Sequence, residues 1–285
     1  MPHRGIEFCE RIKKLAEALA ADPRLDLAIE TFCTGMSRWF RADPLRLAVF
    51  GDLGQMSVVA AGLALQGDGG ITLARIIKLV TGSAVASSRR VRAICDNLDR
   101  MEIISPLPDP TGRREKPLRF GGWLQPALIL WLEVFVQAVL PWLAGPVAAD
   151  NAALVRLLSS HLRGLERFGL EIVAPWPEVR FMLERLAGLP LLMDLMTGAA
   201  SRATLSRKST ALAYGVSRRH IAVLISHAEE EGWIVVDGLG RSLALAATTR
   251  MRLRTWISQE FAVAILALQP RSAARLLSFA SPSER

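Results

Sequence analysis

The chain is poor in the residues from which metal sites and disulfide frameworks are built. Among its 285 residues are three cysteines, Cys9, Cys33 and Cys95, and four histidines. The cysteines are odd in number and far apart, which excludes a regular disulfide framework and a CxxC metal site and favours a reducing cytoplasm. His220 and His227 lack the further ligands that a metal site needs, and His161 has no paired nucleophile. We expect no metal, no cofactor and no enzyme.

Long apolar runs are also few, and one of them has the length of a membrane span. Residues 124–143 form it, but Gln125, Glu133 and Gln137 lie inside it, and a charge at the centre of a bilayer costs roughly 2.5–3.5 kcal/mol. We therefore predict no membrane and a helix buried between subunits or subdomains. Residues 1–20 lack the apolar core of a signal peptide and predict an amphipathic helix. These features favour a cytoplasmic protein.

Charged residues make up only 22% of the chain, yet the net charge is +8 and its distribution is uneven. Residues 72–120 hold ten Lys/Arg and five Asp/Glu, and residues 202–254 hold nine and four. Each window thus carries +5, and the rest of the chain carries −2. Positive charge confined to two segments is what two nucleic-acid contact surfaces require.

The second basic window contains a helix with a marked start. Ser217 is a suitable N-cap, and an apolar stripe at helical spacing follows it, made of Ile221, Leu224, Ile225 and Ala228. The first turn carries three exposed side chains, Arg218, Arg219 and His220, beside the positive end of the helix dipole. Recognition helices enter the DNA major groove by their N-terminal residues, so phosphate and base edges are the expected partners.

The same helix occurs earlier in the chain. A shift of 130 residues places an equivalent apolar stripe, Val91, Ile94, Cys95 and Leu98, over that of the later helix. Two serines and three arginines stand at its start, namely Ser87, Ser88, Arg89, Arg90 and Arg92. One basic turn is as well explained by a solvated surface. Two basic turns at the same place in two repeats favour contact with DNA.

The repeat extends in both directions along the chain. Helices are predicted at 26–40 and 154–168, from Pro44 to Leu65 and from Pro177 to Thr197, at 74–80 and 207–213, and at 124–140 and 251–268. The expected organisation is scaffold helices at 1–43, a first module at 44–120, central scaffold helices at 121–170, a second module at 171–247, and a scaffold helix with a tail at 248–285.

A predicted β-hairpin follows each basic helix. The first hairpin has a long tip rich in turn-forming residues that carries Arg113, Arg114 and Lys116, and the second has a short tip with Arg241. A basic helix followed by a hairpin with a basic tip is the outline of a winged helix-turn-helix, whose wing side chains reach phosphates or the minor groove.

The motifs of the first copy resemble the MarR family of bacterial transcription regulators. The resemblance lies in Val85-Ala-Ser-Ser-Arg-Arg-Val, in Leu98-Asp-Arg-Met-Glu-Ile-Ile and in the hairpin tip Asp109-Pro-Thr-Gly-Arg-Arg-Glu-Lys. The second copy, with Gly215-Val-Ser-Arg-Arg-His-Ile, resembles bacterial winged helix-turn-helix modules more generally. Family members dimerise through their terminal helices, one winged helix per chain. This chain differs from the family pattern in carrying two copies. It differs also in a longer turn expected in copy one, where Val85 stands opposite Gly215, and in the short wing of copy two.

The expected fold is mainly α with small β-wings, as tandem winged helix-turn-helix modules on a shared helical scaffold, an intramolecular pseudo-dimer. The expected function is a bacterial transcription regulator that reads two unequal half-sites of double-stranded DNA, as a monomeric pseudo-dimer or a homodimer. A protein-interaction scaffold that keeps these folds without binding DNA is the alternative. Tryptophans around the central apolar helix either fill a core, the commoner role, or line a pocket for a small-molecule effector; the candidate pocket residues are Trp123, Trp131 and His161.

Overall fold

The computed structural model describes residues 3–66, 70–83, 85–108, 116–168, 175–197, 207–236 and 243–280. Within these ranges the chain is mainly helical and carries two small antiparallel sheets. The expectation of a mainly α protein with small β-hairpins is therefore confirmed.

The first half of the chain contains a three-stranded sheet of order β1-β3-β2. Its elements are α1 (His3–Ala20), α2 (Leu25–Arg41), α3 (Pro44–Phe50), α4 (Leu53–Gln66), β1 (Ile71–Thr72), α5 (Leu73–Gly82), α6 (Ser88–Arg100), β2 (Ile104–Pro106), β3 (Pro117–Phe120), α7 (Leu124–Val139) and the 3-10 turn η1 (Leu140–Trp142).

The second half repeats this order of elements with a two-stranded sheet, β4-β5. Its elements are α8 (Asn151–Phe168), α9 (Pro177–Leu183), α10 (Gly188–Met196), α12 (Arg207–Ala213), α13 (Arg218–Glu230), β4 (Ile234–Val236), β5 (Leu243–Leu245), α14 (Ala247–Leu268) and α15 (Pro270–Ala280).

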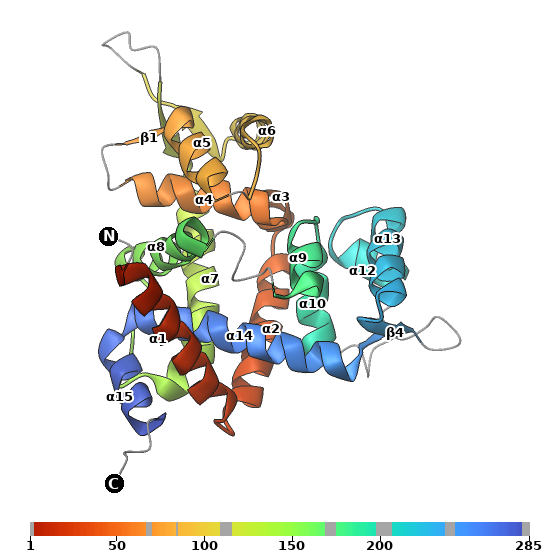
Figure 1. The fold of residues 1–285 in the computed structure, drawn as a ribbon. Helices are drawn as coiled ribbons and strands as arrows, with labels where there is room; N and C mark the ends of the chain where they lie inside the picture. The colour runs from red at the N-terminus through yellow and green to blue at the C-terminus, as the bar shows by residue number, and fades with distance from the viewer. Residues whose placement is uncertain are drawn as a thin grey trace.

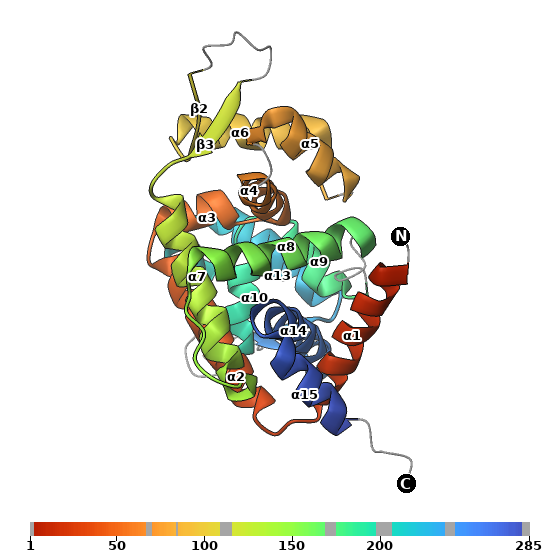
Figure 2. The same ribbon diagram turned by 90° about the vertical axis from the view of Figure 1, so that its left-hand side faces the viewer.

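The two halves pack against each other reciprocally. Helix α10 of the second half packs on α2 of the first, and the corresponding α4 of the first half packs on α8 of the second. Helix α7 contacts α8, and its counterpart α14 contacts α2. Figure 2 shows α8 between α4 and α14. The helix contacts between the two halves therefore match in both directions.

The long apolar helix lies in the middle of this packing. Helix α7 buries eight of its residues and contacts α2, α8 and α14. Phe135 on α7 and Phe261 on α14 both meet the ring of Phe32, with centroids 4.8 and 5.4 Å away. In the part of the chain described, Leu124–Trp142 is the one helix long and apolar enough to cross a membrane, or one of two if the bent pair α3–α4 is counted. The prediction of a buried helix is thus confirmed for one face of α7, whereas Leu130 on its other face is 45% exposed.

Two predicted helices are each broken into two, which corrects the sequence-based expectation. The helix expected from Pro44 to Leu65 bends by 85° between α3 and α4. At the break, a Cβ on Gly51 would lie 2.3 Å from Leu47 O, and the Asp52 carboxylate accepts a hydrogen bond from Gln55 N at 3.0 Å, which starts α4. The helix expected from Pro177 to Thr197 ends at Leu183, and the chain turns through Ala187 at φ 61°.

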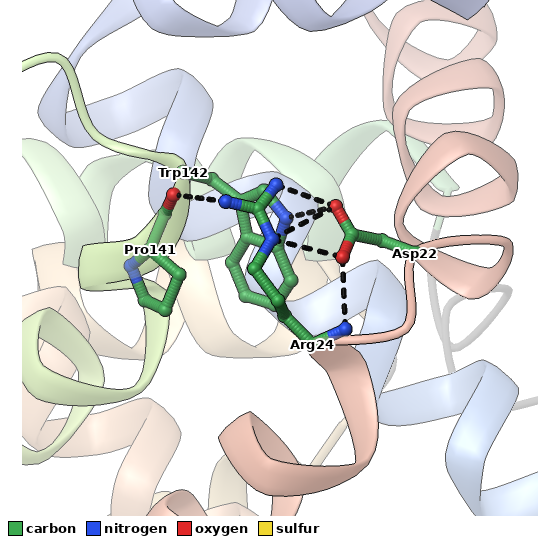
Figure 3. Close-up of polar contacts among 4 residues, drawn as sticks. All are labelled: Asp22, Arg24, Pro141 and Trp142. Carbon is green, nitrogen blue, oxygen red and sulfur yellow. Dashed lines mark hydrogen bonds and ion pairs between the residues drawn. The ribbon is translucent and has the colours of Figure 1, made fainter.

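A polar cluster joins the α1–α2 turn to the end of α7 (Figure 3). The Asp22 carboxylate accepts hydrogen bonds from Arg24 and from Trp142 Nε1, and Arg24 donates to Pro141 O at 2.8 Å. The hydrogen bonds from Arg24, assisted by that from Trp142, hold the pKa of Asp22 well below its ordinary value. The cluster thus fixes the first two helices to the central core.

Figure 1 shows where the two modules stand on this scaffold. Helices α5 and α6 with the β2–β3 hairpin occupy one corner of the molecule, and α12 and α13 with the β4–β5 hairpin occupy another. The first and last helices, α1 and α15, lie on the side of the molecule away from α13.

Candidate nucleic-acid interface

The two basic helices have the same length and the same start. Helix α6 and helix α13 are each 13 residues long and are offset by 130 residues along the chain. The Ser87 hydroxyl accepts a hydrogen bond from Arg90 N at 3.3 Å, and the Ser217 hydroxyl accepts one from His220 N at 3.1 Å. The predicted N-cap is therefore present in the second copy and in its counterpart.

The C-terminal ends of the two helices are closed by equivalent backbone hydrogen bonds. Ile103 N donates to Leu98 O at 2.9 Å, and Trp233 N donates to Ala228 O at 2.8 Å. Both connections use a residue with positive φ, Glu102 at 59° in the first copy and Gly232 at 70° in the second. A strand begins directly afterwards in each case, so the 130-residue offset extends through the backbone of both helices and their exits.

Helix α13 buries its whole predicted apolar stripe, and helix α6 buries all of its stripe except Ile94, which is half-buried. Each helix also carries a second stripe on the side away from the core. Val91, Cys95 and Leu98 are buried on α6, as are Ile221, Leu224, Ile225 and Ala228 on α13. Burial raises the pKa of the Cys95 thiol to about 11, so this cysteine is a neutral packing residue. At spacing i, i+3, i+4 and i+7 on this side, α6 carries Arg89, Arg92, Ala93 and Asp96, all exposed. Helix α13 carries Arg219, Ala222, Val223 and Ser226 at the same positions, of which Ala222 and Ser226 are half-buried.

Not every basic residue expected at the surface of these helices points freely outward. Arg90 pairs with Asp52 at 3.2 Å, in the break between α3 and α4. At the equivalent position of α13, His220 Nε2 lies 2.7 Å from Leu186 O, in the break between α9 and α10. In both copies the third residue of the basic helix therefore joins this helix to the break between the first two helices of its module, α3–α4 or α9–α10. The side chains of Ser88, Arg89, Arg92, Arg218 and Arg219 remain exposed.

The hairpins stand beside the basic helices, although their tips lie outside the described residues. Ile104 pairs with Phe120 in the first hairpin, and Ile234 with Leu245 in the second. Lys116 is exposed and directly precedes β3. Arg113, Arg114 and Arg241 fall outside the described residues. Arg119, which sequence patterning did not single out, is exposed on β3 and donates to Ser105 Oγ at 3.2 Å.

Two of the three residues predicted for an effector pocket line one central cavity. The cavity has a volume of about 170 Å³ and lies where α2, α3, α4, α7, α8, α9, α10 and α14 converge, with Trp131 and His161 in its lining. Trp123 lies elsewhere: its ring stacks on Phe50, and its Nε1 donates to Asp43, the N-cap of α3, at 2.8 Å. The cavity therefore brings together Trp131 and His161 but not Trp123.

His161 holds the polar edge of the cavity together with a carboxylate that the sequence did not indicate. His161 Nε2 lies 2.8 Å from Glu260 Oε2, and Nδ1 lies 3.0 Å from Leu157 O. Both partners are acceptors, so a doubly protonated imidazole satisfies both. Burial is the largest single influence and lowers the pKa of His161. The hydrogen bond and negative charge of Glu260, together with the Leu157 carbonyl, outweigh it and raise the pKa above its ordinary 6.5.

Comparisons with known proteins add no family to this description, since no family model, curated protein or solved structure matches the chain. Within the described residues, no group of three or more His, Cys, Asp or Glu side chains is placed to hold a metal ion. The two basic helices, their hairpins and the central cavity are therefore the features of the molecule that bear on its function.

Proposed function

We propose that the chain is a MarR-like transcription regulator that binds double-stranded DNA through two winged helix-turn-helix modules held on one scaffold. The observation that carries the proposal is the matched pair α6 and α13. They share length, serine cap, exit hydrogen bonds and an outward stripe that begins with arginine. A surface without function gives no reason to repeat an arginine-bearing stripe on both copies of the same framework.

The reciprocal packing supports a two-fold arrangement of the two reading surfaces. In two-fold dimers of helix-turn-helix proteins, recognition helices enter successive major grooves about 34–36 Å apart on one face of the DNA. Here both modules come from one chain, and their outward stripes differ. The expected operator is therefore an imperfect palindrome with unequal half-sites.

Arginine removal at the outward face provides the test. Arg89→Ala and Arg92→Ala in α6, combined with Arg218→Ala and Arg219→Ala in α13, leave the two anchoring residues Arg90 and His220 in place. We expect specific binding to fall by at least about 100-fold, because each good base contact contributes roughly 1–3 kcal/mol. Fluorescence anisotropy with a duplex selected from a random pool measures this, at several salt concentrations because phosphate contacts make affinity salt-dependent.

A control variant tests whether cations far from the two basic helices affect binding. Lys13→Ala and Lys14→Ala remove two exposed cations from α1, on the far side of the scaffold from α13. This variant should keep specific affinity within about twofold, since distant surface charges act weakly through screening. Unchanged affinity in the arginine variant, with unfolding curves like those of the parent, would refute the assignment of α6 and α13 as reading helices.

One observation favours the protein-interaction alternative for the second module. Leu212, Val223 and Val235 are 82%, 57% and 59% exposed there, whereas the described residues of the first module include no comparably exposed large apolar side chain. Exposed apolar side chains favour contact with protein. Anisotropy with random duplex at low salt separates the two functions, because a DNA-binding module shows at least micromolar nonspecific affinity under these conditions.

A further inference from the structure

We propose that the central cavity binds a small, neutral, one-ring aromatic compound that carries a hydroxyl or carbonyl group. Ligand binding at this site does not depend on the DNA-binding function, because it involves residues of the helical core alone. Its effect on DNA affinity would rest on that function.

The volume of the cavity sets the size of the ligand. At about 170 Å³ it is slightly larger than an engineered protein cavity of about 150 Å³ that holds benzene. One ring with one or two further non-hydrogen atoms fits this space. Natural protein interiors are packed at crystal-like density, so a partly open cavity of this size among core side chains leaves room for a ligand.

The lining selects an aromatic ligand. Seven aromatic side chains surround the cavity, namely Phe32, Trp39, Phe40, Phe50, Trp131, Phe135 and Trp256. Several of them already meet edge to face, such as Phe32 with Phe135 at 4.8 Å. Aromatic rings attract one another in this geometry beyond the area they bury, so a ligand ring gains more here than an aliphatic group of equal size.

Two lining residues carry buried polar atoms that need partners. Ser57 Oγ and Trp256 Nε1 are both buried and make no hydrogen bond within the described structure. An indole N–H only donates, whereas a hydroxyl donates and accepts. A ligand oxygen that accepts from Trp256 or exchanges a hydrogen bond with Ser57 would satisfy groups that are otherwise costly to bury.

The charge at the polar edge excludes an anionic ligand. His161 and Glu260 both line the cavity and neutralise each other across 2.8 Å. A ligand carboxylate would enter a low-polarity space beside the Glu260 carboxylate, with the imidazolium already paired. A neutral hydroxyl or carbonyl meets no such repulsion.

Three probe compounds test the proposal on the purified full chain without DNA. Phenol and toluene have the same shape and differ in the hydroxyl group, and benzoate adds a charge. Trp39, Trp131 and Trp256 line the cavity, so tryptophan fluorescence together with calorimetry reports occupancy. We expect saturable binding of phenol at one site, about tenfold weaker binding of toluene because one hydrogen bond is missing, and weaker binding still of benzoate.

The chain supplies matched control variants for the two polar groups. Ser37 Oγ and Trp176 Nε1 are also buried and without a hydrogen bond in the described structure, but neither residue lines the cavity. Ser57→Ala with Trp256→Phe should remove the tenfold preference of phenol over toluene. Ser37→Ala with Trp176→Phe should leave it unchanged.

A third variant fills the cavity. Ala60 belongs to the lining, and Ala60→Leu should lower phenol affinity by at least tenfold while the protein keeps its cooperative thermal transition. Equal binding of phenol and toluene, a preference retained without Ser57 and Trp256, or full affinity in Ala60→Leu would each overturn the proposal.

Discussion

The two modules share a framework and differ in what they present on it. Each has a serine-capped helix of 13 residues, a positive-φ exit and a hairpin. The first presents Arg89, Arg92, Ala93 and Asp96 beside a sheet of three strands, and the second presents Arg219, Ala222, Val223 and Ser226 beside a sheet of two. Residues that build the framework thus repeat in type, while the outward residues have diverged. That division is expected where two copies keep one fold and read different sequences.

On the proposed DNA-binding function, the outward stripes predict the chemistry of the two half-sites. Arginine at the second stripe position of α6 can bond the O6 and N7 atoms of guanine, whereas Ala222 and Val223 on α13 can only make apolar contact, as with a thymine methyl group. The first half-site is therefore expected to be richer in guanine, and the second to contain thymine at the matching step.

Exchanging the stripes should have the largest effect. Ala222→Arg with Val223→Ala gives α13 the second and third outward residues of α6, so the preference at the second half-site should shift toward the first by about 10- to 100-fold, the discrimination of one bidentate contact. Selection of sites from a random duplex pool measures the shift. The reverse exchange, Arg92→Ala with Ala93→Val, should move the first half-site the other way. Unaltered half-sites in both variants would show that these stripes do not read bases.

The two helix exits differ in the residue that occupies the positive-φ position, and this difference predicts opposite effects of substitution there on the free energy of unfolding. Gly232 has φ +70° with nothing near its missing Cβ, and Glu102 has φ +59° at the equivalent place. A left-handed residue with a Cβ costs roughly 1–2 kcal/mol, offset in part by the entropy that glycine loses on folding. Gly232→Ala should lower the free energy of unfolding by about 1 kcal/mol, and Glu102→Gly should raise it by about 0.5 kcal/mol.

Denaturant unfolding curves of both variants measure this pair of changes. The comparison is internal, because any general effect of altering a helix exit acts on both modules alike. Effects of the same sign in the two variants would show that backbone conformation at these positions does not set the difference.

The sequence predicts the framework better than the details that join its parts. Helices α6 and α13 follow from local signals, namely a capping serine and an apolar stripe of period 3.6. The break after α3 does not, because it depends on Gly51, where a Cβ would also meet Leu186 Cδ1 of the second half at 2.4 Å. That contact joins residues far apart in the chain, so no local sequence pattern predicts it.

The same limit applies to the candidate sites. Arg89 and Arg90 are neighbours of one type, yet Arg90 pairs with Asp52 in a turn that the sequence places inside a continuous helix. Trp123 and Trp131 stand near each other in the sequence, but Trp123 precedes α7 and contacts α3, while Trp131 lies on the helix and reaches the cavity. No local sequence pattern indicates Glu260, because its partner His161 is 99 residues away in the chain.

The smallest expected effect concerns the pH dependence of stability, and it comes from two equivalent residues on the scaffold helices α2 and α8. In the predicted repeat, Cys33 on α2 stands opposite His161 on α8. Burial raises the pKa of Cys33 well above its ordinary value, so the thiol stays neutral near pH 7. His161 has a raised pKa through its bond to Glu260. The stabilisation from that raised pKa is complete below the unfolded value of about 6.5 and is lost as pH rises through the folded pKa.

We therefore expect thermal stability to decrease as the pH is raised above about 6.5, by a shallow slope that cannot exceed the loss of one proton, about 1.4 kcal/mol per pH unit. Glu260→Gln removes the carboxylate that favours the imidazolium and should flatten this part of the profile, as should His161→Gln. Cys33→Ser changes the equivalent position of the other half and should leave the slope intact. Melting curves between pH 6 and pH 9 compare the three variants. An unaltered slope in Glu260→Gln would place the titrating group elsewhere, whereas a slope lost in Cys33→Ser would mean that the two positions are coupled through the core that they share.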